Sequence, residues 1–309
     1  MKIGLIGILA NAYKRMTSHN AGWNYVYKSM LEERYGTTVD LVHERDDWSQ
    51  YDHLWVSEGM NFREGVWNLF GGVSDGLINR LNKLSEYQGE LYYWGDFAPD
   101  YQDLSDSRKL DLFIYQPIQP VHQIIESDKI IVGDSHTVSV YEPGWHIDRM
   151  DGRTLYNLAK RDISYFGEMA HDYKKIRFYA GNIDIRFHFC RLYDSVDIYY
   201  EIPKLVEELA EKLSVFEEIE IVDPLRNAPD DRPIPKSGLY KGEPFYGSFD
   251  AREDARAILS NAFKDNFETV LEWPETMYCD EVLSECFMEA RRSVHLAPKS
   301  YMFHGKLFN

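Results

Sequence analysis

The chain has 309 residues, a length typical of two α/β domains. Its 34 lysines and arginines are outnumbered by 51 aspartates and glutamates, and the net charge of −17 disfavours electrostatic capture of a nucleic-acid backbone or an anionic membrane. Hydrophobic residues make up 44% of the chain, which excludes disordered, collagen-like and coiled-coil classes because a sizeable core can form.

Strand-like apolar runs alternate with helix-length amphipathic segments, a pattern that predicts parallel α/β architecture. In the first part, strands are expected at 2–9, 38–42, 53–57, 90–94 and 112–115, and helices at 22–34 and 75–87. In the second part, strands are expected at 129–133, 176–180 and 218–222, and helices at 203–213, 251–263 and 280–291. The Pro-Ile-Gln-Pro segment at 117–120 breaks the periodicity. We therefore predict two domains, 1–126 and 127–309, each with a mainly parallel sheet flanked by helices.

No apolar run approaches the roughly 18 residues that cross a bilayer, so no membrane partner is predicted. The opening apolar run is interpreted as a buried strand, because no small-residue cleavage site follows it. Cys190, Cys279 and Cys286 lack a CxxC spacing and are expected to be reduced core thiols of a cytoplasmic protein. Neither a metal nor a cofactor is predicted.

The sharpest local feature is Gly133-Asp134-Ser135-His136, which directly follows a predicted buried strand. Open α/β sheets bind ligands at the carboxyl ends of their strands. A serine hydroxyl placed there can act as a nucleophile when a base takes its proton and backbone N–H groups stabilise the oxyanion. Aspartate and serine are also favoured at helix N-caps and in turns, so these residues by themselves leave both interpretations open.

Four short segments, in order, resemble the sequence blocks of the SGNH (GDSL-type) hydrolase superfamily. They are 133–136 (GDSH), 154–158 (TLYNL), 181–188 (GNIDIRFH) and 293–296 (SVHL). The third is similar to a Gly-x-Ile-Asp-x-Arg-x-His stretch of a subgroup found among polysaccharide-biosynthesis proteins. The resemblance spans 129–298, over half the chain, and implies an SGNH or flavodoxin-like second domain.

By this resemblance, Ser135 is the nucleophile and His295 the general base, with the N–H of Ser135 as one oxyanion donor. Asp184 is a further candidate catalytic group, although Asp184 and Arg186 could instead form a buried salt bridge. Candidate substrate-binding residues are Gly133, Asp134, His136, Asn157, Asn182, Arg186 and His188. The family pattern is incomplete at three places. Ala159 replaces the glycine of the second block, Ile183 replaces the asparagine of the third, and Arg291 and Arg292 occupy the positions of the base-orienting acid.

The first part weakly resembles the amino-terminal domain of the T-even phage DNA β-glucosyltransferase. The resemblance lies in the opening strand, the Gly-Gly turn at 68–72 and the Tyr-Tyr strand that leads to Asp96. It covers about 100 residues and implies a Rossmann-like domain with Asp96 as a catalytic base. A loop acid that caps the next turn is the alternative interpretation of Asp96.

Three functions from different classes follow. The first is an SGNH-type serine hydrolase, or an acyl or group transferase, acting on a small carbohydrate- or nucleotide-like substrate that the first domain helps to select. The second is a phage-type DNA base-modifying glycosyltransferase that uses Asp96 and has modified DNA as its partner. The third is a non-catalytic binding module with a degenerate SGNH fold. The distance between Ser135 Oγ and the His295 ring discriminates between the first and the third.

Overall fold

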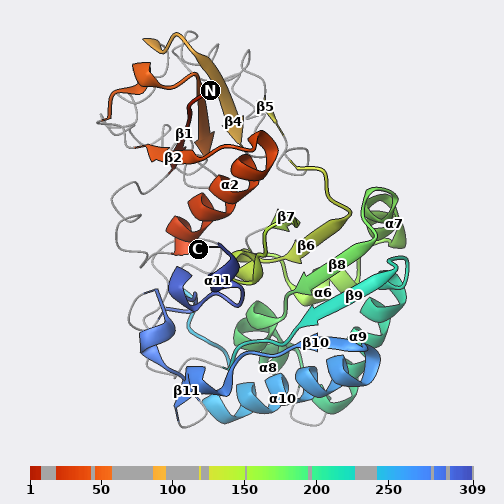
Figure 1. The fold of residues 1–309 in the computed structure, drawn as a ribbon. Coiled ribbons are helices and arrows are strands. Elements are labelled where there is room, and N and C mark those ends of the chain that lie inside the picture. Colours follow the sequence, from red (N-terminus) through yellow and green to blue (C-terminus); the bar gives the residue numbers. More distant parts are fainter. Residues whose placement is uncertain are drawn as a thin grey trace, which may run out of the picture. The chain divides into compact units, whose positions relative to one another are not determined.

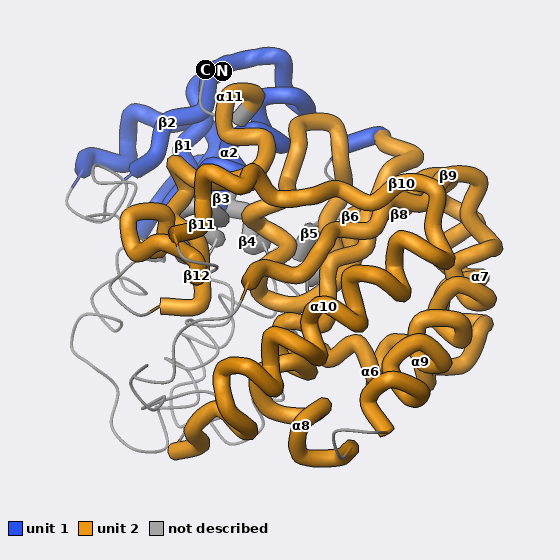
Figure 2. Tube along the Cα trace, turned by 90° about the horizontal axis from the view of Figure 1, so that it is seen from below, with its two compact units in different colours: residues 1–126, 308 blue, residues 127–307, 309 orange. Residues whose placement is uncertain are grey.

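The computed structural model describes residues 1–7, 19–42, 46–57, 86–94, 118–119, 125–149, 152–193, 197–226, 242–279, 282–289 and 293–307. The chain divides into two compact units, residues 1–126 and 127–307, which are coloured separately in Figure 2. Each unit contains its own parallel sheet (Figure 1). No helix within the described ranges is long and apolar enough to cross a membrane.

The sheet of the first unit contains five parallel strands in the order β2-β1-β3-β4-β5. Their bounds are β1 (Ile3–Gly7), β2 (Val39–Val42), β3 (His53–Ser57), β4 (Glu90–Trp94) and β5 (Ile118–Gln119). Helix α2 (His19–Tyr35) connects β1 to β2, and the turn η1 (Trp48–Gln50) precedes β3. A small core forms where Trp48 packs with Ile6, Val42, Tyr51 and Leu54.

The sheet of the second unit is also parallel, in the order β10-β9-β8-β6-β7. Its strands are β6 (Lys129–Gly133), β7 (His146–Arg149), β8 (Lys175–Tyr179), β9 (Glu218–Val222) and β10 (Thr269–Leu271). Its helices are α6 (Leu155–Ala159), α7 (Ile163–Asp172), α8 (Phe189–Leu192), α9 (Ile198–Leu213), α10 (Phe249–Asn266) and α11 (His304–Leu307). Shorter turns are η4 (Ser135–Val140), the π-helical η5 (Asp184–His188), η6 (Glu275–Met277), η7 (Glu285–Phe287) and η8 (Pro298–Ser300).

Both sheets have the same strand order when each is numbered along its own chain segment, namely 2-1-3-4-5. This is the flavodoxin-like doubly wound order. The structure therefore confirms the predicted α/β class with parallel sheets. For the described strands of the first unit, the order is flavodoxin-like rather than that of the six-stranded Rossmann sheet. In the second unit, the strand order reverses at β6, so ligands are expected beyond the carboxyl ends of β6 and β8.

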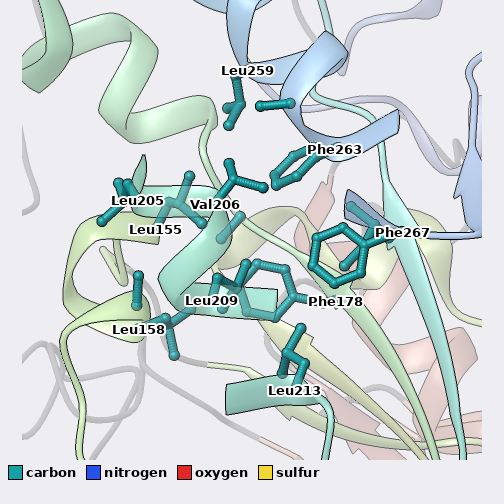
Figure 3. Close-up of a cluster of buried hydrophobic side chains, with 14 of the residues drawn as sticks. Leu155, Leu158, Phe178, Leu205, Val206, Leu209, Leu213, Leu259, Phe263 and Phe267 are labelled. Atoms are coloured by element: carbon teal, nitrogen blue, oxygen red, sulfur yellow. The ribbon is translucent and has the colours of Figure 1, made fainter. Parts of the chain in front are cut away.

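The core of the second unit lies between its sheet and the helices α9 and α10. Helix α9 contributes Leu205, Val206, Leu209 and Leu213, which lie on one helical face, to the cluster that contains Phe178 on β8 (Figure 3). Burying one such side chain contributes about 1.5–3 kcal/mol, so this face holds the helix in place. Pro203, expected to begin the helix, lies inside it.

The structure corrects several expectations about individual elements. The predicted helix at 280–291 is wrong, because its described part contains the short strand β12 (Val282–Leu283), which pairs with β11 (Tyr278–Cys279), and the turn η7. Strands β7 and β10 were not expected. Cys279 and Cys286 are exposed rather than core thiols, and Cys190 is half-buried. The predicted strand at 112–115 and nearly all of the predicted helix at 75–87 lie outside the described residues.

Candidate active site

The turn that carries Ser135 is formed where β6 ends. Gly133, the last residue of β6, is buried, and a Cβ atom there would lie 1.9 Å from the carbonyl oxygen of Tyr179 on β8. Only glycine therefore fits this close approach of the two strands. Asp134 caps the turn η4, since its carboxylate accepts the N–H of His136 at 2.8 Å. These contacts give Gly133 and Asp134 a role in shaping the turn, and Ser135 becomes its first residue.

Ser135 lies within hydrogen-bonding distance of the predicted base. Its Oγ is 3.0 Å from Nε2 of His295, although the two residues are 160 positions apart in the chain. The other ring nitrogen, Nδ1, lies 3.3 Å from Oε1 of Glu289. Serine, histidine and carboxylate thus form a chain of contacts in the order that nucleophilic catalysis requires.

Glu289 was not among the candidates, and contacts of the flanking described residues bring it to the histidine. Met288 and Leu296 form an antiparallel bridge, and the N–H of Glu289 donates to the carbonyl of His295 at 3.0 Å. Ser293 donates its hydroxyl to Glu289 Oε1 at 2.8 Å, while accepting the N–H of His295 at 3.1 Å. The acid therefore precedes the histidine by six residues, and not by the three or four that the family pattern suggests.

The buried ring of His136 connects two segments. The first is the turn η4 at 135–140, called the serine turn, and the second is the segment 293–296 around His295, called the histidine loop. Nδ1 of His136 lies 2.9 Å from Asp134 Oδ1, and Nε2 lies 3.1 Å from the carbonyl oxygen of Val294. The ring is 4.8 Å from that of His295 between centroids. Burial lowers the pKa of His136, although the negative charge of Asp134 acts to raise it. His136 is thus placed to position His295.

Asp184 takes a different place from the one expected of a catalytic group. It is fully buried, and its two carboxylate oxygens accept the N–H groups of Leu155 at 2.7 Å and of Tyr156 at 3.2 Å. N–H groups in the first turn of a helix have no acceptor within the helix, so the carboxylate of Asp184 stabilises the start of α6 by accepting two of them. The carboxylate in contact with His295 is that of Glu289 instead. Burial raises the pKa of Asp184 to about 7, although its backbone hydrogen bonds oppose this.

The raised pKa of Asp184 predicts a pH-dependent contribution to stability. Because the unfolded group titrates near its ordinary value of 3.8, the folded state retains the proton longer, and stability falls as pH rises from about 4 to about 7. Asp184→Asn removes this titration. We compare the difference in thermal midpoint, wild type minus variant, at two pH values. This difference should be larger at pH 5 than at pH 8 by about 2 °C or more. A difference that grows with pH would show that the fold favours the charged carboxylate.

The remaining predicted residues are spread over several elements. Asn157 is exposed on α6, and its N–H donates to the hydroxyl of Thr154. His188 is half-buried and accepts a hydrogen bond from Arg191 at 2.9 Å; burial and the charge of Arg191 lower its pKa. Asn182 and Arg186 are buried beyond β8 and contact each other, since Nε of Arg186 donates to the carbonyl of Asn182 at 2.8 Å. Asp96 and the segment 68–72 lie outside the described residues, so the glucosyltransferase resemblance stays a prediction.

A small, partly open cleft lies beside the histidine loop. Ser293 and Val294, the two residues before His295, form one part of its wall. The rest of its described lining consists of Asn182, Ile185, Arg186, Leu225, Arg226 and Leu283. Asn182 and Arg186 thus meet the histidine loop at this cleft. In the part of the chain that the structure describes, no cluster of three His, Cys, Asp or Glu side chains could hold a metal ion.

No protein-family model matches this chain, and no curated protein matches it. Among solved structures, it is similar to Est24, a carbohydrate acetylesterase from Sinorhizobium meliloti, with 14% identity and a TM-score of 0.39. The match covers 57% of this chain and 94% of that chain. At this identity, a likeness concerns the fold alone.

Proposed function

We propose that this protein is a serine hydrolase or acyl transferase of the SGNH type that cleaves an ester of a small carbohydrate- or nucleotide-like molecule. The observation that carries this proposal is the chain of contacts from Ser135 Oγ through the His295 ring to Glu289. The 3.0 Å contact favours catalysis over a non-catalytic binding module, because a base must reach the proton that it abstracts. The carbohydrate-like substrate class is supported by the resemblance of 181–188 to a polysaccharide-biosynthesis subgroup.

Exposure of the contacting side chains supports catalysis over a purely structural network. The side chains of His295 and Glu289 are 26% and 22% exposed, whereas the neighbouring pair of His136 and Asp134 is 2% and 0% exposed. A structural polar network is usually buried, as the His136–Asp134 pair is. Ser135 and His295 are instead open enough for a substrate to reach them.

The proposed mechanism follows from the roles of the three side chains. His295 Nε2 takes the hydroxyl proton as Ser135 Oγ forms a bond to the carbonyl carbon of the ester, and the backbone N–H of Ser135 donates to the developing oxyanion. The ester C–O bond then breaks, and the departing alcohol receives the proton from Nε2. Water, or an acceptor hydroxyl in the case of transfer, attacks the acyl-serine by the reverse proton path. Glu289 holds the ring with Nδ1–H toward itself, which leaves Nε2 as the acceptor.

A serine-directed fluorophosphonate provides the direct test. We expect the wild-type protein to form a covalent adduct on the peptide that contains Ser135, identified by mass spectrometry after digestion. Prior heat denaturation should abolish labelling, because an isolated serine is a weak nucleophile. Absence of an adduct at Ser135, together with no hydrolysis of p-nitrophenyl acetate, would refute the proposal.

A further inference from the structure

The cleft beside the histidine loop is defined by two arginines, Arg186 and Arg226, and we call it the Arg186–Arg226 cleft. Its described lining contains no acidic side chain, whereas the chain as a whole has a net charge of −17. A cationic recess in an acidic protein concentrates anions locally. The cleft therefore has the charge that an anionic ligand requires.

Arg186 is a buried cation held in a fixed orientation. Only 7% of the residue is exposed, and Nε donates to the carbonyl of Asn182 at 2.8 Å. Arg186 lines the cleft together with Ser293 and Val294, the two residues that precede His295. Arg186 thus joins the cleft to the catalytic residues.

Arg226 is more accessible but is also oriented by its neighbours. Its guanidinium lies 4.4 Å from the centre of the Tyr278 ring and donates to the exposed carboxylate of Glu275 at 2.8 Å. The Glu275 side chain is 78% exposed, so solvent weakens this ion pair. An anion in the cleft would compete with Glu275 for the Arg226 guanidinium.

Asn182 adds a neutral donor to the same wall. Its Oδ1 accepts the N–H of Leu225 at 3.1 Å, which fixes the orientation of the amide. Nδ2 is then left as a buried donor that makes no hydrogen bond with the described residues. The guanidinium and amide N–H₂ groups on this wall are donors, a chemistry that suits the oxygens of a carboxylate or a phosphate.

We propose that the Arg186–Arg226 cleft binds an anionic group, a carboxylate or a phosphate, on the substrate whose ester Ser135 attacks. This inference rests on the proposed function and specifies its substrate class. Ser293 connects the two parts of the site, because it lines the cleft while its hydroxyl bonds both Glu289 and the N–H of His295. An anion held there fixes the rest of the substrate relative to the base, which lowers the entropy cost of attack.

A matched set of aryl acetates tests this inference. The set consists of 4-acetoxybenzamide, which is neutral, 4-acetoxybenzoate, which carries a carboxylate, and 4-acetoxyphenyl phosphate. We expect the wild-type kcat/KM for at least one anionic ester to exceed that for the neutral ester by about tenfold, mainly through KM. The two anionic esters distinguish a carboxylate site from a phosphate site.

Variants of Arg226 locate this preference in the cleft. Arg226→Gln should lower kcat/KM for the preferred anionic ester at least fivefold and leave the neutral ester unchanged, while Arg226→Lys keeps part of the preference. Arg256→Gln is the matched control, since Arg256 on α10 is also a partly exposed, ion-paired arginine but does not line the cleft. Arg226 is the primary target because replacing the buried Arg186 risks unfolding.

Failure of this inference is distinguishable from failure of the proposed function. Equal rates on all three esters with Ser135-dependent turnover, or a preference that survives Arg226→Gln, would overturn the anion site and leave the hydrolase proposal intact. If the wild type neither hydrolyses an ester nor reacts with the fluorophosphonate, the hydrolase proposal falls. Calorimetric titration with inorganic phosphate and 4-hydroxybenzoate then tests the anion site without relying on catalysis. Binding that is weakened by Arg226→Gln supports the site, and absence of binding refutes it.

Discussion

Replacing Ser135 with alanine is expected to lower kcat/KM for p-nitrophenyl acetate by about a thousandfold or more. The substitution removes the hydroxyl oxygen that lies 3.0 Å from Nε2 of His295, which is the attacking atom in the proposed mechanism. Residual turnover would come from the oxyanion donors and from water. Because the serine and the base act as a unit, His295→Ala should cause a loss of similar size, and the double variant should be no worse.

Ser139→Ala is the control for this experiment. Ser139 lies on the same turn η4 and is buried, but its hydroxyl donates to the carbonyl of His136 at 2.6 Å. Losing that hydrogen bond costs about 1 kcal/mol of stability and leaves the reacting atoms in place. Both variants should have circular dichroism spectra like that of the wild type. If Ser135→Ala kept half or more of the wild-type rate on p-nitrophenyl acetate, this serine would be excluded as the nucleophile.

Glu289→Gln is expected to lower kcat by about a hundred- to ten-thousandfold. The amide can place its N–H₂ toward Nδ1 of His295, which stabilises the tautomer that has its proton on Nε2 and cannot accept one from Ser135. Fluorophosphonate labelling should slow in parallel, because the same proton transfer activates the serine toward that reagent. A purely structural carboxylate would change the thermal midpoint without this parallel loss.

Glu285→Gln provides the comparison within the same part of the chain. Glu285 is exposed on the turn η7, and its charge is identical to that of Glu289. We expect this variant to keep the wild-type kcat within about twofold. If both glutamine variants had equal activity, Glu289 would not orient the base, and the missing acid of the family pattern would have no substitute in this loop.

The sequence predicted the part of the site that depends on local pattern. The apolar run at 129–133 followed by Gly-Asp-Ser indicates a buried strand and a turn, and these residues form β6 and η4. A serine placed after such a strand lies at the carboxyl edge of the sheet whatever the rest of the fold. Pairing Ser135 with His295 required the family resemblance, since no periodicity relates residues 160 positions apart.

Glu289 and the role of Asp184 could not be predicted in this way. Apolar and charged residues in 280–291 match a helical period, so the segment resembled a helix, yet tertiary contacts such as the Met288–Leu296 bridge determine its structure. A carboxylate six residues from a histidine carries no sequence signal until the loop is known. Asp184 lies in a motif that suggests chemistry, but its partners are the N–H groups of Leu155 and Tyr156, and backbone donors leave no trace in sequence.

The buried ring of His136, which bridges the serine turn and the carbonyl of Val294, has a consequence for the order of events during protein synthesis. The ribosome releases residues 135–140 long before residues 293–296. Until the later segment is made, His136 lacks the carbonyl of Val294 and Ser135 lacks the ring of His295. In the proposed mechanism, activity therefore requires the same late segment that completes the hydrogen bonding of the early turn.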